Sequence, residues 1–161
     1  MPRKIVIIGA HAAGVDAASA ARKADRKAEI TLMTKQKMQG YSPCGIPYVI
    51  GGQIPSFDDL VVFPPSYFRM MKLDLRLETT ANKIDTEAKT VEIEDKKGKE
   101  ETLEYDSLIL TTGAYPFMPP IKGRDKQGVY VVRTIQDGKR IDAALENTEH
   151  AVVVGAGVIG L

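Results

Sequence analysis

The chain has 161 residues, of which 43% are hydrophobic and 27% charged, and its formal net charge is +1. This length suffices for one ordinary domain with a buried core, and the composition is that of a globular protein. The near-zero net charge gives no reason to expect nucleic acid or a membrane surface as a partner. No apolar run is long enough to span a bilayer.

The N-terminal third has the pattern of a βαβ unit. Residues 5–8 are a continuous β-branched run, which predicts a parallel strand buried on both faces. The run ends at Gly9, too early for the apolar core of a signal peptide. A glycine turn follows at 9–14, then an alanine-rich helix over 12–24 and a second strand over 28–33, which completes the unit.

The only cysteine, Cys44, follows this unit within the segment 40–48. One cysteine cannot form an intramolecular disulfide, which fits a reducing, cytoplasmic location or a thiol kept for chemistry. Cys44 stands where a short second helix is predicted to begin, and a helix N-terminus stabilises a thiolate. Gly45 lacks a side chain, so a flat ring could approach the sulfur. In the alternative interpretation Cys44 is a small buried hydrophobic residue.

The middle of the chain predicts an antiparallel insertion. After a helix over 65–71, residues 73–77 alternate like a strand. Residues 90–94 and 101–105 form a hairpin, and 108–111 return to the parallel sheet. The predicted class is α/β, a Rossmann-like FAD-binding fold with a parallel sheet and an inserted antiparallel β-meander, because such an insertion is common in flavin-binding relatives of the dinucleotide fold.

The C-terminal part contains a proline-rich connector, a helix over 136–145 and a second glycine fingerprint at 155–160. The fingerprint follows an apolar run and normally opens a helix, for which no residues remain. We therefore predict a nucleotide-binding domain over 1–118, a connector with a helix over 119–149, and the first strand and glycine turn of a truncated second nucleotide-binding domain over 150–161.

The first glycine turn departs from the usual dinucleotide fingerprint. His11 replaces the middle glycine, which ordinarily lets the pyrophosphate approach the backbone. Thr34 and then Lys35 stand where an acidic residue for the ribose is expected, so ribose binding should be weaker or differently arranged. A turn without any ligand is the alternative. His11 could polarise an oxidised sulfur or a peroxide, or simply contact solvent or backbone, and we do not assign it as a catalytic base.

Four motifs in this order resemble the flavin-dependent pyridine nucleotide–disulfide oxidoreductases. They are the glycine turn 9–14, the Ser-Pro-Cys-Gly-Ile-Pro-Tyr segment 42–48, Thr-Thr-Gly-Ala at 111–114 and the second fingerprint 154–160. The resemblance is to the single-cysteine branch of NADH oxidases, NADH peroxidases and coenzyme A-disulfide reductases, because neither position five residues from Cys44 is a cysteine.

The resemblance implies that residues 1–118 are the N-terminal portion of an FAD-binding domain and that residues 150–161 begin an NAD(P)-binding domain. Electrons would pass from NAD(P)H through the flavin to Cys44, the catalytic residue. The acceptor would be oxygen, coenzyme A disulfide or polysulfide, and the intact protein would be a homodimer without a metal. FAD would contact Gly9, Ala10, His11, Ala12, Ala13, Gly14, Thr34, Lys35, Ser42, Cys44, Ala81, Thr111, Thr112 and Gly113. The nicotinamide nucleotide would contact Gly155, Gly157 and Gly160.

Some positions limit this resemblance. The peroxidase branch has a histidine at the position of Ala12, so peroxide reduction is not supported. Lys23 and Lys72 match basic groups that bind coenzyme A as substrate, whereas other polar contacts of that branch are missing. The chain by itself should not turn over NADH. The alternatives are a non-catalytic module that binds a nucleotide or a partner chain, and pairing of residues 150–161 with another copy.

Overall fold

The computed structural model describes residues 1–157 and 160, and the chain divides into two compact units. Unit 1 contains residues 1–41 and 61–113, and unit 2 contains residues 42–60 and the chain from 114 onward. Residues 42–48 of the cysteine segment thus belong to the same unit as the proline-rich connector. No helix in the described part of the chain is long and apolar enough to cross a membrane.

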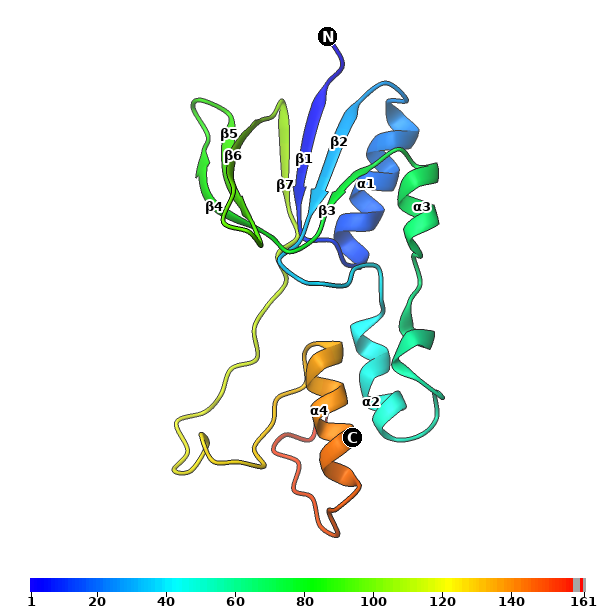
Figure 1. The fold of residues 1–161 in the computed structure, drawn as a ribbon, viewed down its shortest axis with the longest axis vertical. Helices are drawn as coiled ribbons and strands as arrows, with labels where there is room; N and C mark the ends of the chain where they lie inside the picture. The colour runs from blue at the N-terminus through cyan, green and yellow to red at the C-terminus, as the bar shows by residue number, and fades with distance from the viewer. Residues whose placement is uncertain (158–159, 161) are drawn as a thin grey trace. The chain divides into compact units, whose positions relative to one another are not determined.

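Unit 1 is built on a parallel sheet with the strand order β3-β2-β1-β7 (Figure 1). Every neighbouring pair is parallel, as the β-branched run at 5–8 predicts. The strands are β1 (Lys4–Ile8), β2 (Glu29–Met33), β3 (Asp74–Arg76) and β7 (Ser107–Leu110). Since parallel strands share one direction, the glycine turn after β1 and the threonine pair after β7 emerge at the same edge of the sheet.

Alternation along β1 and β2 creates two separate hydrophobic cores. Ile5 and Ile7 of β1, with Ile30 and Leu32 of β2, pack against α1 (Ala12–Ala24) and the aromatic residues of α3 (Pro65–Met70). Val15 and Ala18 of α1 are fully buried there, so the small residues of this helix allow close packing on the sheet.

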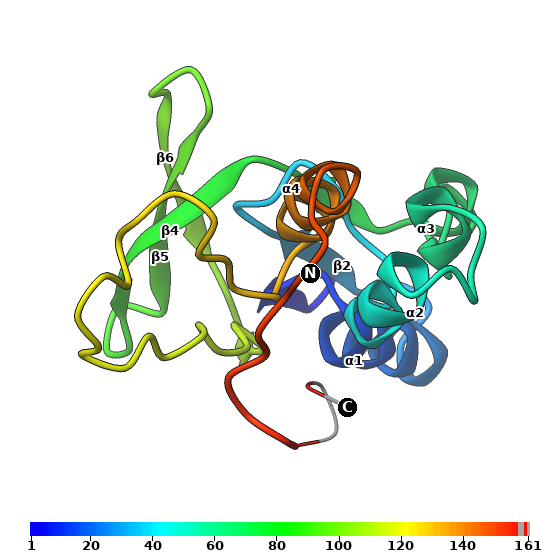
Figure 2. The ribbon, with the colours of Figure 1, turned by 90° about the horizontal axis from the view of Figure 1, so that it is seen from below.

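The opposite face of the sheet is covered by an antiparallel meander (Figure 2). Its strands are β4 (Thr79–Asp85), β5 (Thr90–Asp95) and β6 (Glu100–Glu104), in that order. Val91 and Ile93 of β5 pack with Val6 and Met33 of the parallel sheet. The predicted α/β class with an inserted meander is confirmed. The prediction missed β4, a largely polar edge strand whose pairing is interrupted between Ala81 and Lys83.

Unit 2 is organised around the packing of α4 (Ile135–Leu145) on α2 (Ile46–Ile50). A Cβ atom on Gly138 would lie 2.8 Å from Ile46 Cγ2 and 2.6 Å from Phe57 Cε1, so the backbone of α4 touches these side chains directly. Two 3-10 turns, η1 (Pro43–Gly45) and η2 (Phe57–Leu60), flank α2 in the sequence. Helix α4 therefore packs against Ile46, two residues after Cys44.

The predicted strand before the second fingerprint is wrong for residues 151–154, which form no strand. Val152, Val153 and Val154 have 90%, 66% and 78% of their surface exposed. A strand needs a neighbour for its backbone hydrogen bonds and a core for its side chains, and neither is described next to this segment.

Candidate functional site

The glycine turn brings three backbone segments of unit 1 into direct contact. Gly9 has a φ of +116°, and a Cβ atom there would lie 2.1 Å from the carbonyl oxygen of Thr111. A Cβ atom on Gly14 would lie 1.8 Å from the carbonyl oxygen of Gly9. Only glycine fits these two positions. The Thr111 hydroxyl lies 3.1 and 3.0 Å from the carbonyl oxygens of Ile8 and Gly9, which joins β7 to the turn.

The N-terminus of α1 opens directly from this turn, and no acidic side chain lies in its first turn. The first backbone N–H groups of an α-helix have no partner within the helix, and together with the helix dipole they favour an anion. Ala12 and Ala13 at this end are exposed, whereas Ala10 is fully buried. The arrangement therefore fits a phosphate-bearing group at the carboxyl edge of the sheet.

Thr34 follows β2 at the same edge. Its backbone N–H donates to Arg76 and its carbonyl accepts from Thr79. The backbone N–H of Gln36 lies 3.3 Å from the Thr34 hydroxyl oxygen. The hydroxyl keeps its own proton for donation, whereas a carboxylate at this position could only accept from a ribose. Lys35, next in the chain, is exposed.

His11, which stands in place of the middle glycine, makes side-chain contacts within unit 1. Its Nε2 lies 3.0 Å from Gln36 Oε1, and that oxygen also accepts from the Tyr41 hydroxyl at 2.9 Å. The His11 and Tyr41 rings meet edge to face at 4.6 Å. Because an amide oxygen only accepts, Nε2 carries the proton in this arrangement. The turn histidine thus contacts two side chains of unit 1, whereas the second of its two interpretations expected solvent or backbone. No sequence pattern pointed to Gln36 or Tyr41.

The other predicted cofactor residues of unit 1 lie around the same sheet. Ala81 packs against the core between β1 and the meander, close in sequence to Thr79, which is bonded to Thr34. Thr112 and Gly113 follow β7 and are exposed, and Gly113 has a φ of +70°.

Lys23 and Lys72, the predicted substrate residues, are both exposed in unit 1. Lys72 has a φ of +50°, uncommon for a residue with a side chain. The Arg22 guanidinium supports this conformation, since it donates to the carbonyl oxygens of Met71 and Lys72 at 3.0 and 2.9 Å. It also donates to Ala28 at 2.7 Å. Arg22 therefore ties the end of α1 to the loop that carries Lys72, a role that the sequence did not reveal.

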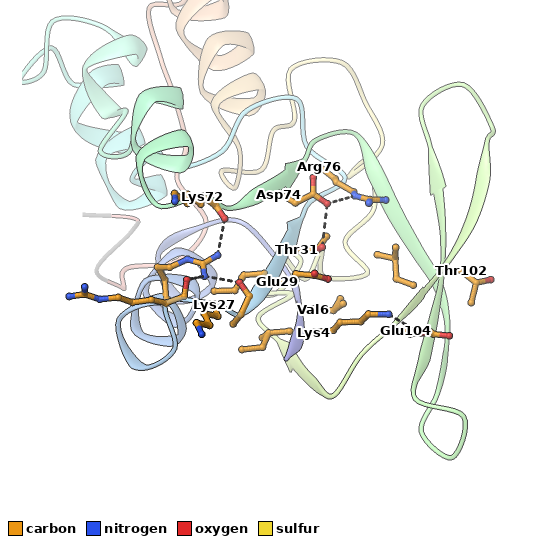
Figure 3. A pocket seen from close by; sticks show the side chains of 16 residues that line it. Lys4, Val6, Lys27, Glu29, Thr31, Lys72, Asp74, Arg76, Thr102 and Glu104 are labelled. Atoms are coloured by element: carbon orange, nitrogen blue, oxygen red, sulfur yellow. Dashed lines mark hydrogen bonds and ion pairs between the residues drawn. The ribbon is translucent and has the colours of Figure 1, made fainter. Parts of the chain in front are cut away.

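A polar pocket of about 680 Å³ lies in unit 1, away from the glycine turn (Figure 3). It is lined by Lys4 and Glu29, the first residues of β1 and β2, so it opens at the amino ends of the strands. Ion pairs occupy part of its wall, and the hydrogen bond and charge of Glu104 raise the pKa of Lys4. Ligands of open α/β sheets bind at the carboxyl ends, so we do not assign the cofactor to this pocket.

Residues 42–48 of the cysteine segment lie in unit 2. Cys44 is exposed, and its Sγ lies 2.9 Å from the Ser42 hydroxyl oxygen. The turn is held by backbone bonds from Ser42 to Leu60 at 2.8 Å and from Gly45 to Ser42 at 3.1 Å. A Cβ atom on Gly45 would lie 2.4 Å from Leu60 Cδ2. Cys44 thus lies in the short turn η1, and the helix that follows it, α2, has only five residues.

The glycine residues of the second fingerprint also lie in unit 2. Gly155 has a φ of +117°, and a Cβ atom on Gly160 would lie 2.0 Å from the Gly155 carbonyl oxygen. This close approach resembles that of Gly14 to Gly9 in the first turn. Gly157 is exposed with open space around its α-carbon. The residues between Gly157 and Gly160 are outside the described part.

Comparison with known proteins matches residues 3–161 to the family model "Pyridine nucleotide-disulphide oxidoreductase". An NADH oxidase of Methanocaldococcus jannaschii is 46% identical over 98% of this chain and 36% of that protein. An NAD(P)H coenzyme A polysulfide/persulfide reductase of Pyrococcus horikoshii is 32% identical over 100% of this chain and 36% of that protein. The chain therefore spans about a third of the length of these relatives.

The fold is also found in solved structures. A water-forming NADH oxidase from Lactobacillus brevis, bound to NADH, superposes with a TM-score of 0.92 at 25% identity, over 98% of this chain and 35% of that one. The comparison confirms the Rossmann-like oxidoreductase fold, and the resemblance of the four sequence motifs is confirmed by the family match.

Proposed function

Because the chain belongs to the pyridine nucleotide–disulphide oxidoreductase family, we propose that it is the FAD-binding portion of an NAD(P)H-dependent oxidoreductase with Cys44 as its redox centre. Proteins of this family use FAD and NAD(P)H. The observation that carries the proposal is the contact between the glycine turn and Thr111. The N-terminus of α1 follows this turn at the carboxyl edge of the sheet, and its first residues, Ala12 and Ala13, are exposed.

The residues of unit 1 fit the adenosine diphosphate part of FAD. Gly9 and Gly14 let the backbone approach closely, and the first N–H groups of α1 would hold the pyrophosphate. The Thr34 hydroxyl would donate to a ribose oxygen in place of the usual carboxylate. Bound FAD would supply two-electron transfer between a nicotinamide nucleotide and a thiol.

Cys44 would supply the sulfur that exchanges electrons with the acceptor. Reduction of a mixed disulfide between Cys44 and a small thiol takes two electrons and one proton, and leaves the Cys44 thiolate and the free thiol. The alternative oxidised form is a sulfenic acid on Cys44. Neither form requires a second cysteine, and Cys44 is the only cysteine of this chain.

The acceptor in this proposal is oxygen or a small disulfide or polysulfide. The relatives named above include both an NADH oxidase and a coenzyme A polysulfide/persulfide reductase. Lys23 and Lys72 are exposed cations that could hold the phosphates of coenzyme A. The intact protein is proposed to be a cytoplasmic homodimer.

The proposal predicts that the 161-residue chain binds FAD. We expect Gly14→Ala to weaken binding at least roughly tenfold, because the new Cβ atom forces α1 away from Gly9. Titration with FAD, followed by the quenching of flavin fluorescence, measures this affinity. Asp16→Ala is the matched control, since Asp16 is an exposed residue of the same helix and should leave the affinity unchanged.

Circular dichroism of both variants separates a local effect from loss of fold. Failure of the folded chain to bind FAD would favour the rival function, a non-catalytic module that binds another nucleotide or a protein partner. Equal affinities of the wild type and a folded Gly14→Ala variant would exclude the glycine turn as the FAD site.

A further inference from the structure

We propose that Ser42 is the residue that stabilises the Cys44 thiolate, an inference that rests on the redox role proposed for Cys44 above. The Ser42 hydroxyl oxygen lies 2.9 Å from Cys44 Sγ. With a neutral thiol either atom could donate the hydrogen bond. Once the thiol has lost its proton only the hydroxyl can donate, so the contact favours the charged form.

The backbone N–H and the carbonyl group of Ser42 both form hydrogen bonds, which fix the position of its side chain next to the sulfur. The N–H group of Ser42 donates to Leu60 at 2.8 Å, and its carbonyl accepts from Gly45 at 3.1 Å. Leu60 is buried, with 3% of its surface exposed. Ser42 is therefore anchored to the core of unit 2 from both sides of its α-carbon.

Two arginines of unit 2 are engaged with groups other than Cys44. The Arg133 guanidinium donates to the carbonyl oxygen of Ala114, and Arg140 is paired with Asp137. The turn η1 and the five-residue helix α2 are too short to supply a strong helix dipole. The Ser42 hydroxyl is the side-chain group that the structure shows hydrogen-bonded to Sγ.

The test uses the fact that Cys44 is the only cysteine, so alkylation of the chain reports on this sulfur. The rate of reaction with iodoacetamide is measured at pH 7 and pH 10 for the wild type and for Ser42→Ala. A hydrogen bond to a charged group is worth about a tenfold change in ionisation, partly offset by the greater nucleophilicity of a more basic thiolate. We therefore expect Ser42→Ala to react roughly threefold to tenfold more slowly at pH 7.

At pH 10 the thiol is ionised in each protein, and Ser42→Ala should react at least as fast as the wild type. Ser42→Thr keeps the hydroxyl and should restore most of the rate at pH 7. Ser56→Ala is the matched control, because it removes a serine hydroxyl of the same unit that bonds to Asp59. It should react like the wild type at both pH values.

Two failures are distinguishable. If the wild type reacts faster than free glutathione at pH 7 and Ser42→Ala reacts as fast as the wild type, the role of Ser42 is wrong and the proposed function stands. If the wild type reacts no faster than glutathione, Cys44 is not activated, and the proposed redox role fails together with this inference. Slower reaction of Ser42→Ala at both pH values would indicate altered access to the sulfur and would also overturn the inference.

Discussion

His11 stands where a dinucleotide-binding turn ordinarily has its middle glycine, and its contacts explain how the turn accommodates it. The imidazole is bonded to Gln36 and packed on Tyr41, so it is held by the loop that follows β2. The turn still keeps the two glycines that permit the close contacts with Thr111 and with each other. A side chain at the middle position is thus compatible with the turn, and its effect on cofactor affinity stays a prediction.

Cys44 is the residue on which the proposed chemistry depends. We predict that Cys44→Ser abolishes reduction of disulfides, because serine cannot form a mixed disulfide. Oxidation of NADH by oxygen should persist, since reduced flavin reacts with oxygen without a thiol. The assay needs the longer polypeptide, because this chain corresponds to 36% of the length of the relatives described above. Ser56→Ala is the control. Unchanged disulfide turnover in Cys44→Ser would eliminate the proposed redox role.

At the scale of elements, a local sequence pattern caps the start of α4, the helix that packs against α2 next to Cys44. Thr134 and Asp137 form a capping box, in which each side chain accepts from the backbone N–H of the other. Burial by itself would raise the pKa of Asp137, but hydrogen bonds from Thr134 and the charge of Arg140 bring it below its ordinary value. Gly138 then places α4 against Ile46, two residues after Cys44.

We predict that Asp137→Asn lowers the free energy of unfolding by about 1–2 kcal/mol at pH 7. A carboxylate whose pKa is lower in the folded state stabilises the fold at pH values above its unfolded pKa of about 3.9. This stabilisation is lost as the pH falls through the pKa of the folded state. The difference between wild type and variant should therefore shrink below about pH 4. Urea unfolding between pH 7 and pH 3 measures it.

Asp142→Asn is the control for this prediction, because Asp142 is an exposed acidic residue on the same helix. Its stability should follow that of the wild type at every pH. A difference for Asp137→Asn that stays constant down to pH 3 would contradict the assignment of the pH dependence to this carboxylate.

At the scale of the whole molecule, the three exposed valines 152–154 form an apolar segment directly before the second fingerprint. Exposed apolar segments with unpaired backbone groups promote association. We predict that the 161-residue chain self-associates with increasing concentration and that Val153→Asp shifts the population toward monomer. Sedimentation velocity measures the distribution. Val129→Asp, at another exposed valine, should associate like the wild type. Equal association of all three proteins would rule out this surface.

The sequence by itself determined the parallel strands, the alanine-rich helix and the four motifs that identify the family. These features are local, because a buried strand needs a β-branched run and a tight turn needs glycine at a particular place. It also predicted α4 within one residue of its observed start. The polar strand β4 escaped prediction because its order comes from pairing with β5 rather than from its own pattern.

Only the tertiary structure decided which groups face each other across long stretches of chain. The contacts of Gly14 with Thr111, of Arg22 with Lys72 and of Gly138 with Phe57 join residues that are distant in sequence. The same holds for the coil at 151–154, whose apolar pattern predicts a strand but whose backbone has no described partner to pair with. Local patterns determine what a segment can form, and its neighbours in space determine whether the required hydrogen bonds and burial are available.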